Sequence, residues 1–324
     1  MNNYLPPQAS AWTGRQTDPA LGPQYWYQRM QLLDVRHLET ASPRITHALV
    51  GYACDEGVRR NQGRVGAVDG PAVARTYLGK MAAHFGPETV IADAGTVSCP
   101  DGDLETCQAT YAEIVSRLRR QGIIPIGIGG GHDIAFGTYS GLRAALPSGR
   151  IGILNFDAHF DLRAPTDGPN SGTPFHQILA RHGKDTAYCV VGIQRLGNTP
   201  FLFQTAADLG VTYLERPLCA NDPMSRKAVS QRLRSFIDEV DHLYVTVDLD
   251  GFSAAYAPGV SASSPVGFSP SFFFPVLEEV LRSSKLVGLD VAEFNPLYDR
   301  ADNTLRLLGN VIAAVLIVPR QLTQ

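Results

Sequence analysis

Apolar runs of strand length alternate with longer segments of helical periodicity along most of the chain. The short runs predict strands at residues 45–53, 89–92, 123–128, 151–157, 187–192, 211–214, 243–248 and 286–290. The longer segments predict helices at residues 104–121, 134–146, 175–182, 200–209, 223–240, 270–283 and 301–317. Strands that alternate with helices pair in parallel and carry helices on both faces. We therefore expect an α/β fold, a three-layer α/β/α sandwich with a mostly parallel central sheet of about eight strands.

Length and composition favour one large domain. The chain has 324 residues, of which 44% are hydrophobic, enough to bury a large core. We assign residues 41–324 to a single α/β domain. Residues 1–40 are rich in proline, glutamine and aromatic residues, and we expect them to form an arm over this domain or over a neighbouring subunit of a homo-oligomer.

Net charge and hydropathy exclude several kinds of partner. The formal net charge is −3 and the charges are scattered, so the chain has no electrostatic footprint for nucleic acid or for an anionic membrane. The longest apolar runs, such as residues 311–318, are too short to span a bilayer. No secretion signal pattern is evident, and the five cysteines are odd in number and lack C-x-x-C spacing. These features predict free thiols in a reducing, cytoplasmic setting.

Metal-capable side chains follow two of the predicted strands. Asp157, His159 and Asp161 stand at every second position, and so do Asp248 and Asp250. In extended backbone, residues i, i+2 and i+4 project from the same side. Each run therefore aims its ligands into one space.

A third predicted strand contributes another histidine. Residues 123–128 lead through three consecutive glycines into His132. The three strand ends together offer two histidines and four aspartates, more than one metal ion uses. Two metal ions that share bridging carboxylates use all six, and such a centre activates water.

Each motif has a plainer interpretation when it is taken alone. The glycines at 129–131 are also typical of a flexible turn or of an anion site at a helix N-terminus. A lone acidic pair usually caps a helix or faces solvent, and His159 alone fits a hydrogen-bonded core histidine. The combination favours metal binding, because unpaired buried carboxylates cost several kcal/mol each unless a cation compensates them.

The chain resembles the ureohydrolases, the superfamily of arginases and agmatinases, over most of its length. The resemblance rests on GGGH at 129–132, NFDAHFD at 155–161, SGTPF at 171–175, VDLD at 247–250 and EFNP at 293–296. Within the superfamily, WTGR at 12–15, GVRRNQGR at 57–64 and the motif at 171–175 are most similar to the formimidoylglutamase branch. The resemblance implies the arginase-like form of the fold expected above.

The resemblance also implies how the six ligands divide between two metal ions. It implies two bridging carboxylates, Asp157 and Asp248, with His132 and Asp161 completing one site and His159 and Asp250 the other. Carboxylate-rich coordination with only two imidazoles suits Mn²⁺ better than Zn²⁺. We therefore expect two Mn²⁺ per chain, with Co²⁺ or Ni²⁺ as substitutes.

The reaction implied by the resemblance is hydrolysis. A metal-bridging hydroxide attacks the planar carbon of an amidine or guanidine, and the metals stabilise the tetrahedral intermediate. Glu293, just past the predicted strand at 286–290, matches the superfamily's substrate-orienting glutamate. Its alternative role is a surface or helix-capping carboxylate.

One position departs from the arginases and agmatinases. Those enzymes have a histidine that helps to move protons where this chain has Ser171. A serine is neither acid nor base near pH 7, so proton transfer has to run through water, Asp161 or the substrate, and Ser171 is left as a substrate-binding residue. His176 either takes over the proton transfer or lies on a helix surface. The departure fits formimidoylglutamase, for which the resemblance implies conversion of N-formimino-L-glutamate and water to L-glutamate and formamide in histidine degradation.

Such a substrate carries two carboxylates, and several cations are available to bind them. Arg59, Arg60 and Arg64 follow the first predicted strand on a glycine-bounded loop that also contains Asn61. The fork of an arginine matches a carboxylate. Arg163, just after the NFDAHFD motif, is another candidate. The alternative is a solvated basic loop.

Other functions stay open at this point. A guanidino-acid ureohydrolase of the agmatinase or guanidinobutyrase type releases urea instead of formamide. A catalytically silent relative typically loses ligands, whereas all six are present here. A zinc deacetylase on a related sheet requires a pair of catalytic histidines, and the sequence has no His-His pair.

Overall fold

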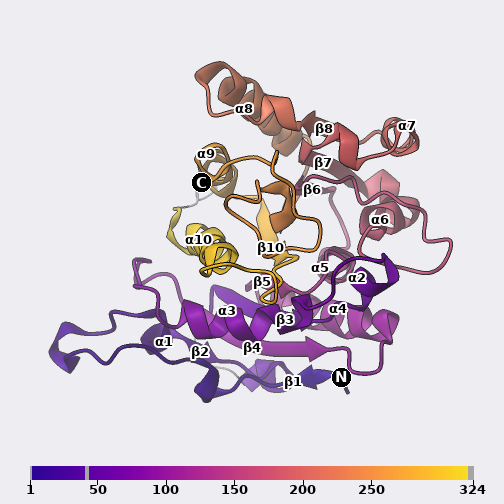
Figure 1. Ribbon diagram of the computed structural model, residues 1–324. Coiled ribbons are helices and arrows are strands. Elements are labelled where there is room, and N and C mark those ends of the chain that lie inside the picture. The colour runs from indigo at the N-terminus through magenta and orange to yellow at the C-terminus, as the bar shows by residue number, and fades with distance from the viewer. Residues whose placement is uncertain (1, 41–43, 320–324) are drawn as a thin grey trace.

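The computed structural model describes residues 2–40 and 44–319, and ten strands of this part of the chain form one sheet (Figure 1). The strands are β1 (Tyr4–Leu5), β2 (Gln31–Leu32), β3 (His47–Ala53), β4 (Ile91–Ser98), β5 (Ile124–Gly129), β6 (Ile151–Phe156), β7 (Thr186–Ile193), β8 (Thr212–Glu215), β9 (His242–Asp248) and β10 (Leu286–Ala292). Their order is β1-β4-β3-β5-β10-β9-β6-β7-β8, and β2 also pairs with β4. Among the described strands only the β1–β4 pair is antiparallel. The carboxyl ends of β3 to β10 therefore meet at one edge.

Helices cover both faces of this sheet. One layer contains α3 (Gly70–Leu78), α8 (Pro223–Asp238), α9 (Pro270–Leu281) and α10 (Asn303–Ile317), and the other contains α4 (Leu104–Arg120), α5 (Ile134–Ala145), α6 (Pro174–His182) and α7 (Pro200–Asp208). The strands alternate accordingly, because Leu49 and Leu289 pack with the first layer whereas Val50 and Val287 pack with the second. This arrangement confirms the α/β/α sandwich expected from the sequence.

The strand β10 joins the two halves of the sheet. It is the last described strand along the chain, and it pairs with β5 on one side and β9 on the other. Within the described residues, no other strand links β1–β5 to β6–β9. Figure 1 shows β10 near the centre of the molecule, beside β5.

Residues 2–40 run along the β4 edge of the sheet. Both β1 and β2 pair with β4, which brings the sheet to ten strands instead of the predicted eight or so. Farther along, the Trp12 indole donates a hydrogen bond of 2.8 Å to the buried Asp93 carboxylate of β4. The boundary predicted between residues 40 and 41 adjoins residues 41–43, which lie outside the described residues, so the division into arm and domain stays a prediction.

Most predicted elements are present, with a few differences. The predicted strands correspond to β3–β10 and the predicted helices to α4–α10. The predicted strand at 89–92 is longer in the structure, where β4 covers Ile91–Ser98. Three short helices were not predicted, namely α1 (Trp26–Arg29), α2 (Glu56–Arg60) and α3, and α2 occupies the start of the expected arginine-rich loop. No helix in residues 2–40 or 44–319 is long and apolar enough to cross a bilayer, and all five cysteines are free thiols.

Candidate metal centre

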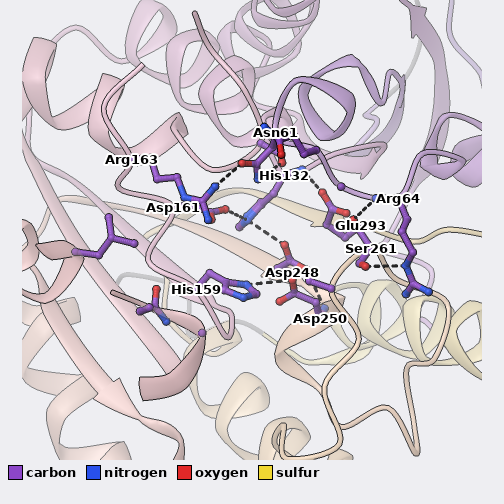
Figure 2. Close-up of a pocket in the computed structure, with 17 residues that line it drawn as sticks. Asn61, Arg64, His132, His159, Asp161, Arg163, Asp248, Asp250, Ser261 and Glu293 are labelled. Atoms are coloured by element: carbon purple, nitrogen blue, oxygen red, sulfur yellow. Dashed lines mark hydrogen bonds and ion pairs between the residues drawn. The ribbon is translucent and has the colours of Figure 1, made fainter. Parts of the chain in front are cut away.

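The carboxyl edge of the sheet opens into a cavity of about 330 Å³ (Figure 2). Most of the candidate residues from the sequence line it, namely Asn61, Arg64, His132, His159, Asp161, Arg163, Ser171, Asp248, Asp250 and Glu293. Asp157 is fully buried beside His132 and His159. The structure thus brings together side chains that are as far apart in the sequence as residues 61 and 293.

A glycine turn places His132 at this edge. The turn follows β5, and the Gly131 N–H donates a hydrogen bond of 3.0 Å to the Cys54 carbonyl at the end of β3. A Cβ atom at Gly130 would lie only 1.7 Å from that same carbonyl oxygen, so no larger residue fits there. The close approach of the two strand ends carries His132 directly into the cavity.

Two groups of ligands share one carboxylate. His132 Nδ1 lies 3.0 Å from Asp161 Oδ2, 3.2 Å from Asp157 Oδ2 and 3.2 Å from Asp248 Oδ2. His159 Nδ1 lies 3.2 Å from Asp250 Oδ2 and 3.5 Å from Asp157 Oδ1. The two oxygens of Asp157 therefore face two different histidines, so Asp157 belongs to both groups of metal-capable side chains.

Residues two positions upstream on the strands orient these ligands. Asn155 donates a hydrogen bond of 2.9 Å to Asp157 Oδ2. Thr246 Oγ1 lies 3.0 Å from His132 Nε2 and donates its own hydrogen to Asp290 on β10. With that hydrogen committed, Thr246 accepts from His132 Nε2, and Nδ1 is directed at the carboxylates.

The electrostatics of the cluster favour a cation. Burial and the charge of Asp157 raise the pKa of Asp161 to about 6, and burial and the charge of Asp250 raise the pKa of Asp248 well above its usual value. Burial lowers the pKa of His132, but hydrogen bonds with the surrounding carboxylates outweigh it and raise that pKa well above the usual value. Asp250 Oδ1 is buried without a hydrogen-bond partner. Oxygen donors with two imidazole nitrogens suit Mn²⁺ or a similar divalent ion, so the donor set fits the expected metal.

Glu293 lies beside the cluster with one oxygen free. Its Oε1 accepts a hydrogen bond of 3.0 Å from the His132 N–H, whereas Oε2 is buried without a partner. Burial and the charge of Asp250 raise the pKa of Glu293 to about 8. Glu293 and Asp161 both have left-handed backbone conformations, with φ of 67° and 49°. Such strain concentrates at functional sites, because the surrounding structure has to enforce it.

Two arginines at the rim of the cavity have different hydrogen-bond partners. Arg163 donates a hydrogen bond of 2.7 Å to Asn61, and Asn61 in turn donates one of 3.0 Å to Ser171 Oγ. Arg64 donates to the backbone carbonyls of residues 260 and 261 and stacks on Tyr298. Arg163 therefore donates one hydrogen bond, to another residue of the cavity lining, whereas Arg64 is held against the backbone by two hydrogen bonds and by its ring contact.

Three further candidates lie outside the cavity lining. Arg59 forms an ion pair with Glu56 at 2.6 Å and points to solvent. Arg60 forms ion pairs with Glu56 and Glu105, each at 2.9 Å. His176 lies on α6 and does not line the cavity either.

Several residues of the site were missed by the sequence analysis. Asn155 and Thr246 stand two positions before a predicted ligand, so the same period of two would have identified them. Asn198 and Ser261 also line the cavity, but they lie in loops between elements. No local pattern marks such loop residues.

Known proteins resemble this chain over most of its length. A family model described as the arginase family matches residues 45–318. A formimidoylglutamase from Geobacillus thermodenitrificans is 42% identical over 323 residues, covering 98% of each chain.

Solved structures show the same fold. A formimidoylglutamase from Bacillus subtilis superposes with a TM-score of 0.76 at 20% identity, covering 85% of this chain and 88% of the other. A formiminoglutamase from Trypanosoma cruzi, solved with Mn²⁺, gives a TM-score of 0.75 at 24% identity and covers 89% of this chain and 99% of the other.

Proposed function

The chain belongs to the arginase family, and we propose that it is a binuclear manganese hydrolase that converts N-formimino-L-glutamate and water to L-glutamate and formamide. This reaction breaks a C–N bond of a linear amidine, as the name of its 42% identical relative indicates for that protein. In this proposal the enzyme serves histidine degradation in the cytoplasm, as a homo-oligomer.

The observation that carries the proposal is the pairing of opposite charges across one cavity. Buried carboxylates and the free oxygen of Glu293 stand at the floor, and Arg163 stands at the rim. An amidine that ends in two carboxylates has the complementary distribution, with its cation at one end and its anions at the other.

Six residues would hold the two ions. Asp157 and Asp248 would be shared, and the rest would divide as the two observed groups do, with His132 and Asp161 in one and His159 and Asp250 in the other. When bound, two divalent ions supply a nucleophile from water at neutral pH and stabilise negative charge that develops in the transition state.

Glu293 would bind and orient the substrate. Its free Oε2 accepts hydrogen bonds from the amidinium nitrogens, and the positive charge relieves the cost of a buried, ionised carboxyl group. Arg163, held by Asn61 beside Ser171, binds a substrate carboxylate at the other end of the cavity. These two anchors hold the amidine carbon over the metal-binding carboxylates.

Asp161 would move the proton. Ser171 cannot do so near neutral pH, and the Oδ1 of Asp161 is the oxygen that is not turned toward His132. Water forms a C–O bond with the amidine carbon, and the C–N bond to the glutamate nitrogen breaks. Asp161 takes one proton of the attacking water and passes it to that nitrogen. The second proton of the water leaves as the C–OH group becomes the formamide carbonyl, and it ends on the amine, so that the amidinium cation yields neutral formamide and glutamate with an ammonium group.

Four parallel incubations test this proposal. The Mn²⁺-loaded protein is given N-formimino-L-glutamate, arginine, agmatine and guanidinobutyrate separately, and formamide, urea and glutamate are measured. We expect equimolar formamide and glutamate from the first compound and no urea from the others. Urea from a guanidino compound would instead assign the chain to the guanidino-acid ureohydrolases, and no product from any of them would indicate a silent relative.

A further inference from the structure

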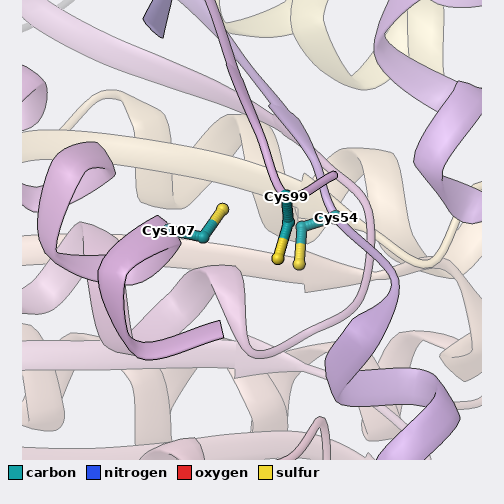
Figure 3. Close-up of side chains that lie close together, drawn as sticks. All are labelled: Cys54, Cys99 and Cys107. Carbon is teal, nitrogen blue, oxygen red and sulfur yellow. The ribbon is translucent and has the colours of Figure 1, made fainter. Parts of the chain in front are cut away.

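Three of the five cysteines meet at a place that the proposed reaction does not use. Cys54 directly follows β3, Cys99 directly follows β4, and Cys107 lies in the first turn of α4. Their sulfur atoms all lie within 4.8 Å of one another, and none of the three residues lines the cavity (Figure 3). We call Cys54, Cys99 and Cys107 the thiol cluster.

Sheet register brings the cluster together. Ala53 of β3 and Ser98 of β4 are direct partners in the parallel pair, so Cys54 and Cys99, one residue later, leave the sheet side by side. Figure 3 shows their sulfurs pointing the same way, with Cys107 facing them from its helix. No sequence spacing reveals this convergence, because the three cysteines stand far apart in the sequence or on different elements.

The spacing of the sulfurs matches a soft metal ion. Zinc binds thiolate sulfur at about 2.3 Å, so three sulfurs in a trigonal plane around one ion lie about 4 Å apart. The sulfurs of the cluster already lie within 4.8 Å of one another and need only small shifts. Cys54 and Cys107 are buried and Cys99 is half-buried, so Cys99 provides the entry path from solvent.

The surroundings of the cluster keep Cys54 and Cys99 protonated while no cation is bound. Burial raises the pKa of Cys99 to about 12, and Asp101 adds to the effect. The hydrogen bond with Cys107, burial and the charge of Asp133 raise the pKa of Cys54 still further. Neutral thiols of this kind are slow to oxidise. A soft divalent cation has to displace these protons, and it does so because its bonds to three sulfurs are strong.

We propose that the thiol cluster binds one soft divalent cation of the Zn²⁺ and Cd²⁺ class, separately from the carboxylate centre. Binding breaks three S–H bonds, forms three S–metal bonds and releases three protons to the buffer. The ion ties together the ends of β3, β4 and α4. It also lies next to the glycine turn of His132, because the Cys54 carbonyl accepts from the Gly131 N–H. It therefore stabilises the framework on which the cavity is built.

Cadmium provides a direct probe of this site, because thiolate ligands give Cd²⁺ an ultraviolet charge-transfer band that carboxylate and imidazole ligands do not give. The reduced full-length protein, saturated with Mn²⁺, is titrated with CdCl₂ while absorbance and the free Cd²⁺ concentration are measured. We expect the band to saturate at one Cd²⁺ per chain. Mn²⁺, which prefers oxygen ligands, should produce no band.

Substitutions assign the band to the cluster. Cys99→Ser should weaken Cd²⁺ binding by at least about 10-fold, since even residues that only support a ligand contribute about 10 to 100-fold to metal affinity. Cys189→Ser and Cys219→Ser remove buried thiols outside the cluster and should leave the band unchanged. Far-UV circular dichroism confirms that each variant is folded.

Two outcomes would overturn the proposal. One is a wild-type protein without a charge-transfer band, and the other is a Cys99→Ser variant that binds Cd²⁺ as tightly as the wild type. Either means that the cluster only packs in the core. Because Cys99 is half-buried and serine is nearly isosteric, this test stands even if Cys54→Ser or Cys107→Ser fails to fold. Amidine hydrolysis with Mn²⁺ should be the same in Cys99→Ser and wild type, so this proposal and the proposed function fail separately.

Discussion

At the scale of single residues, the site depends on orientations that the backbone does not adopt readily. Asp161 and Glu293 both have positive φ angles, which costs about 1 to 3 kcal/mol for each non-glycine residue. Asp157 is fully buried and directs one oxygen toward each histidine. We therefore expect even an isosteric substitution, such as Asp to Asn, to change metal binding at this site.

Asp157→Asn should remove both metal ions, whereas Asp250→Asn should remove one. Asp157 faces both histidines, and an amide in its place takes away negative charge from both positions. The carboxylate of Asp250 belongs to the His159 group alone. Elemental analysis after dialysis measures the ions per chain. Equal losses in the two variants would contradict the bridging role of Asp157.

Arg163→Ala should raise KM for N-formimino-L-glutamate by about 10 to 100-fold, since a hydrogen bond to a charged group is worth about 1.5 to 3 kcal/mol. Metal content should stay unchanged, because Arg163 is not among the clustered metal-capable residues. Steady-state kinetics measures KM. Arg234→Ala provides the matched control, since Arg234 is an exposed arginine paired with Glu279 far from the cavity.

The same KM measurements distinguish Arg163, which lines the cavity, from Arg59, which does not. Arg59 pairs with Glu56 and points to solvent, so its replacement by alanine should change KM much less than Arg163→Ala. If Arg59→Ala raises KM as strongly, the arginine-rich loop binds the substrate in a way that the cavity lining does not reveal.

At the scale of elements, local patterns predicted most of the sheet but not its N-terminal edge. The strands β5, β6 and β9 are largely apolar runs, and the candidate ligands that follow β6 and β9 have the period of two. In contrast, the predicted strand at 89–92 was too short because Asp93 interrupts the apolar pattern. The helix α3 was missed in part because Arg75 stands on its buried face. Neither residue looks like core until its partner is known.

Arg75 and Asp93 form an ion pair with each other. Arg75 donates hydrogen bonds of 2.9 Å to both oxygens of Asp93, and Trp12 donates to the same carboxylate. Both charged residues are almost completely buried. A buried ion pair of this kind is a long-range property that no local pattern predicts.

Asp93→Asn should destabilise the protein by about 3 to 5 kcal/mol, because it leaves the Arg75 charge buried without its counter-ion. The free energy of unfolding in urea measures the effect. Asp34→Asn, in the exposed pair with Arg36, should cost no more than about 1 kcal/mol. A similar small loss in Asp93→Asn would mean that water or Trp12 compensates the arginine.

At the scale of the whole molecule, the cavity forms where the loops of both halves of the sheet meet. His132 comes from the half that ends with β5, and Asp157 and Asp248 come from the half that contains β6 and β9. The strand-end ligands could be predicted because parallel strands end at one edge. The loop residues Asn198 and Ser261 could not, since their positions depend on how distant loops pack over that edge.

Removal of the metal should make the stability of the protein depend on pH. Folding raises the pKa of Asp161 to about 6 and that of Glu293 to about 8, so the metal-free folded state holds protons that the unfolded state has released. Stability should therefore fall as pH rises from about 4 to 8. The raised pKa values of His132 and His159 act in the same direction above about pH 6.5, where the imidazoles of the unfolded chain lose their protons.

Thermal unfolding with EDTA and with saturating Mn²⁺ measures this effect. We expect the difference in Tm between the two forms to grow as pH rises from 5 to 8, because deprotonated ligands also bind metal more tightly. Comparing the two forms cancels the contribution of distant groups such as His182 and His242, whose pKa values burial lowers. A difference in Tm that does not change with pH would contradict the raised pKa values of Asp161 and Glu293 in the metal-free protein.

The central place of β10 in the sheet also determines when the enzyme becomes complete during its synthesis. The ribosome makes His132 some 160 residues before it finishes β10, a delay of roughly 10 to 30 s at ordinary translation rates. Until then β5 has an unpaired edge, of the kind that attracts other chains. A nascent chain therefore cannot bring the six candidate ligands together in one cavity until β10 has joined the two halves of the sheet.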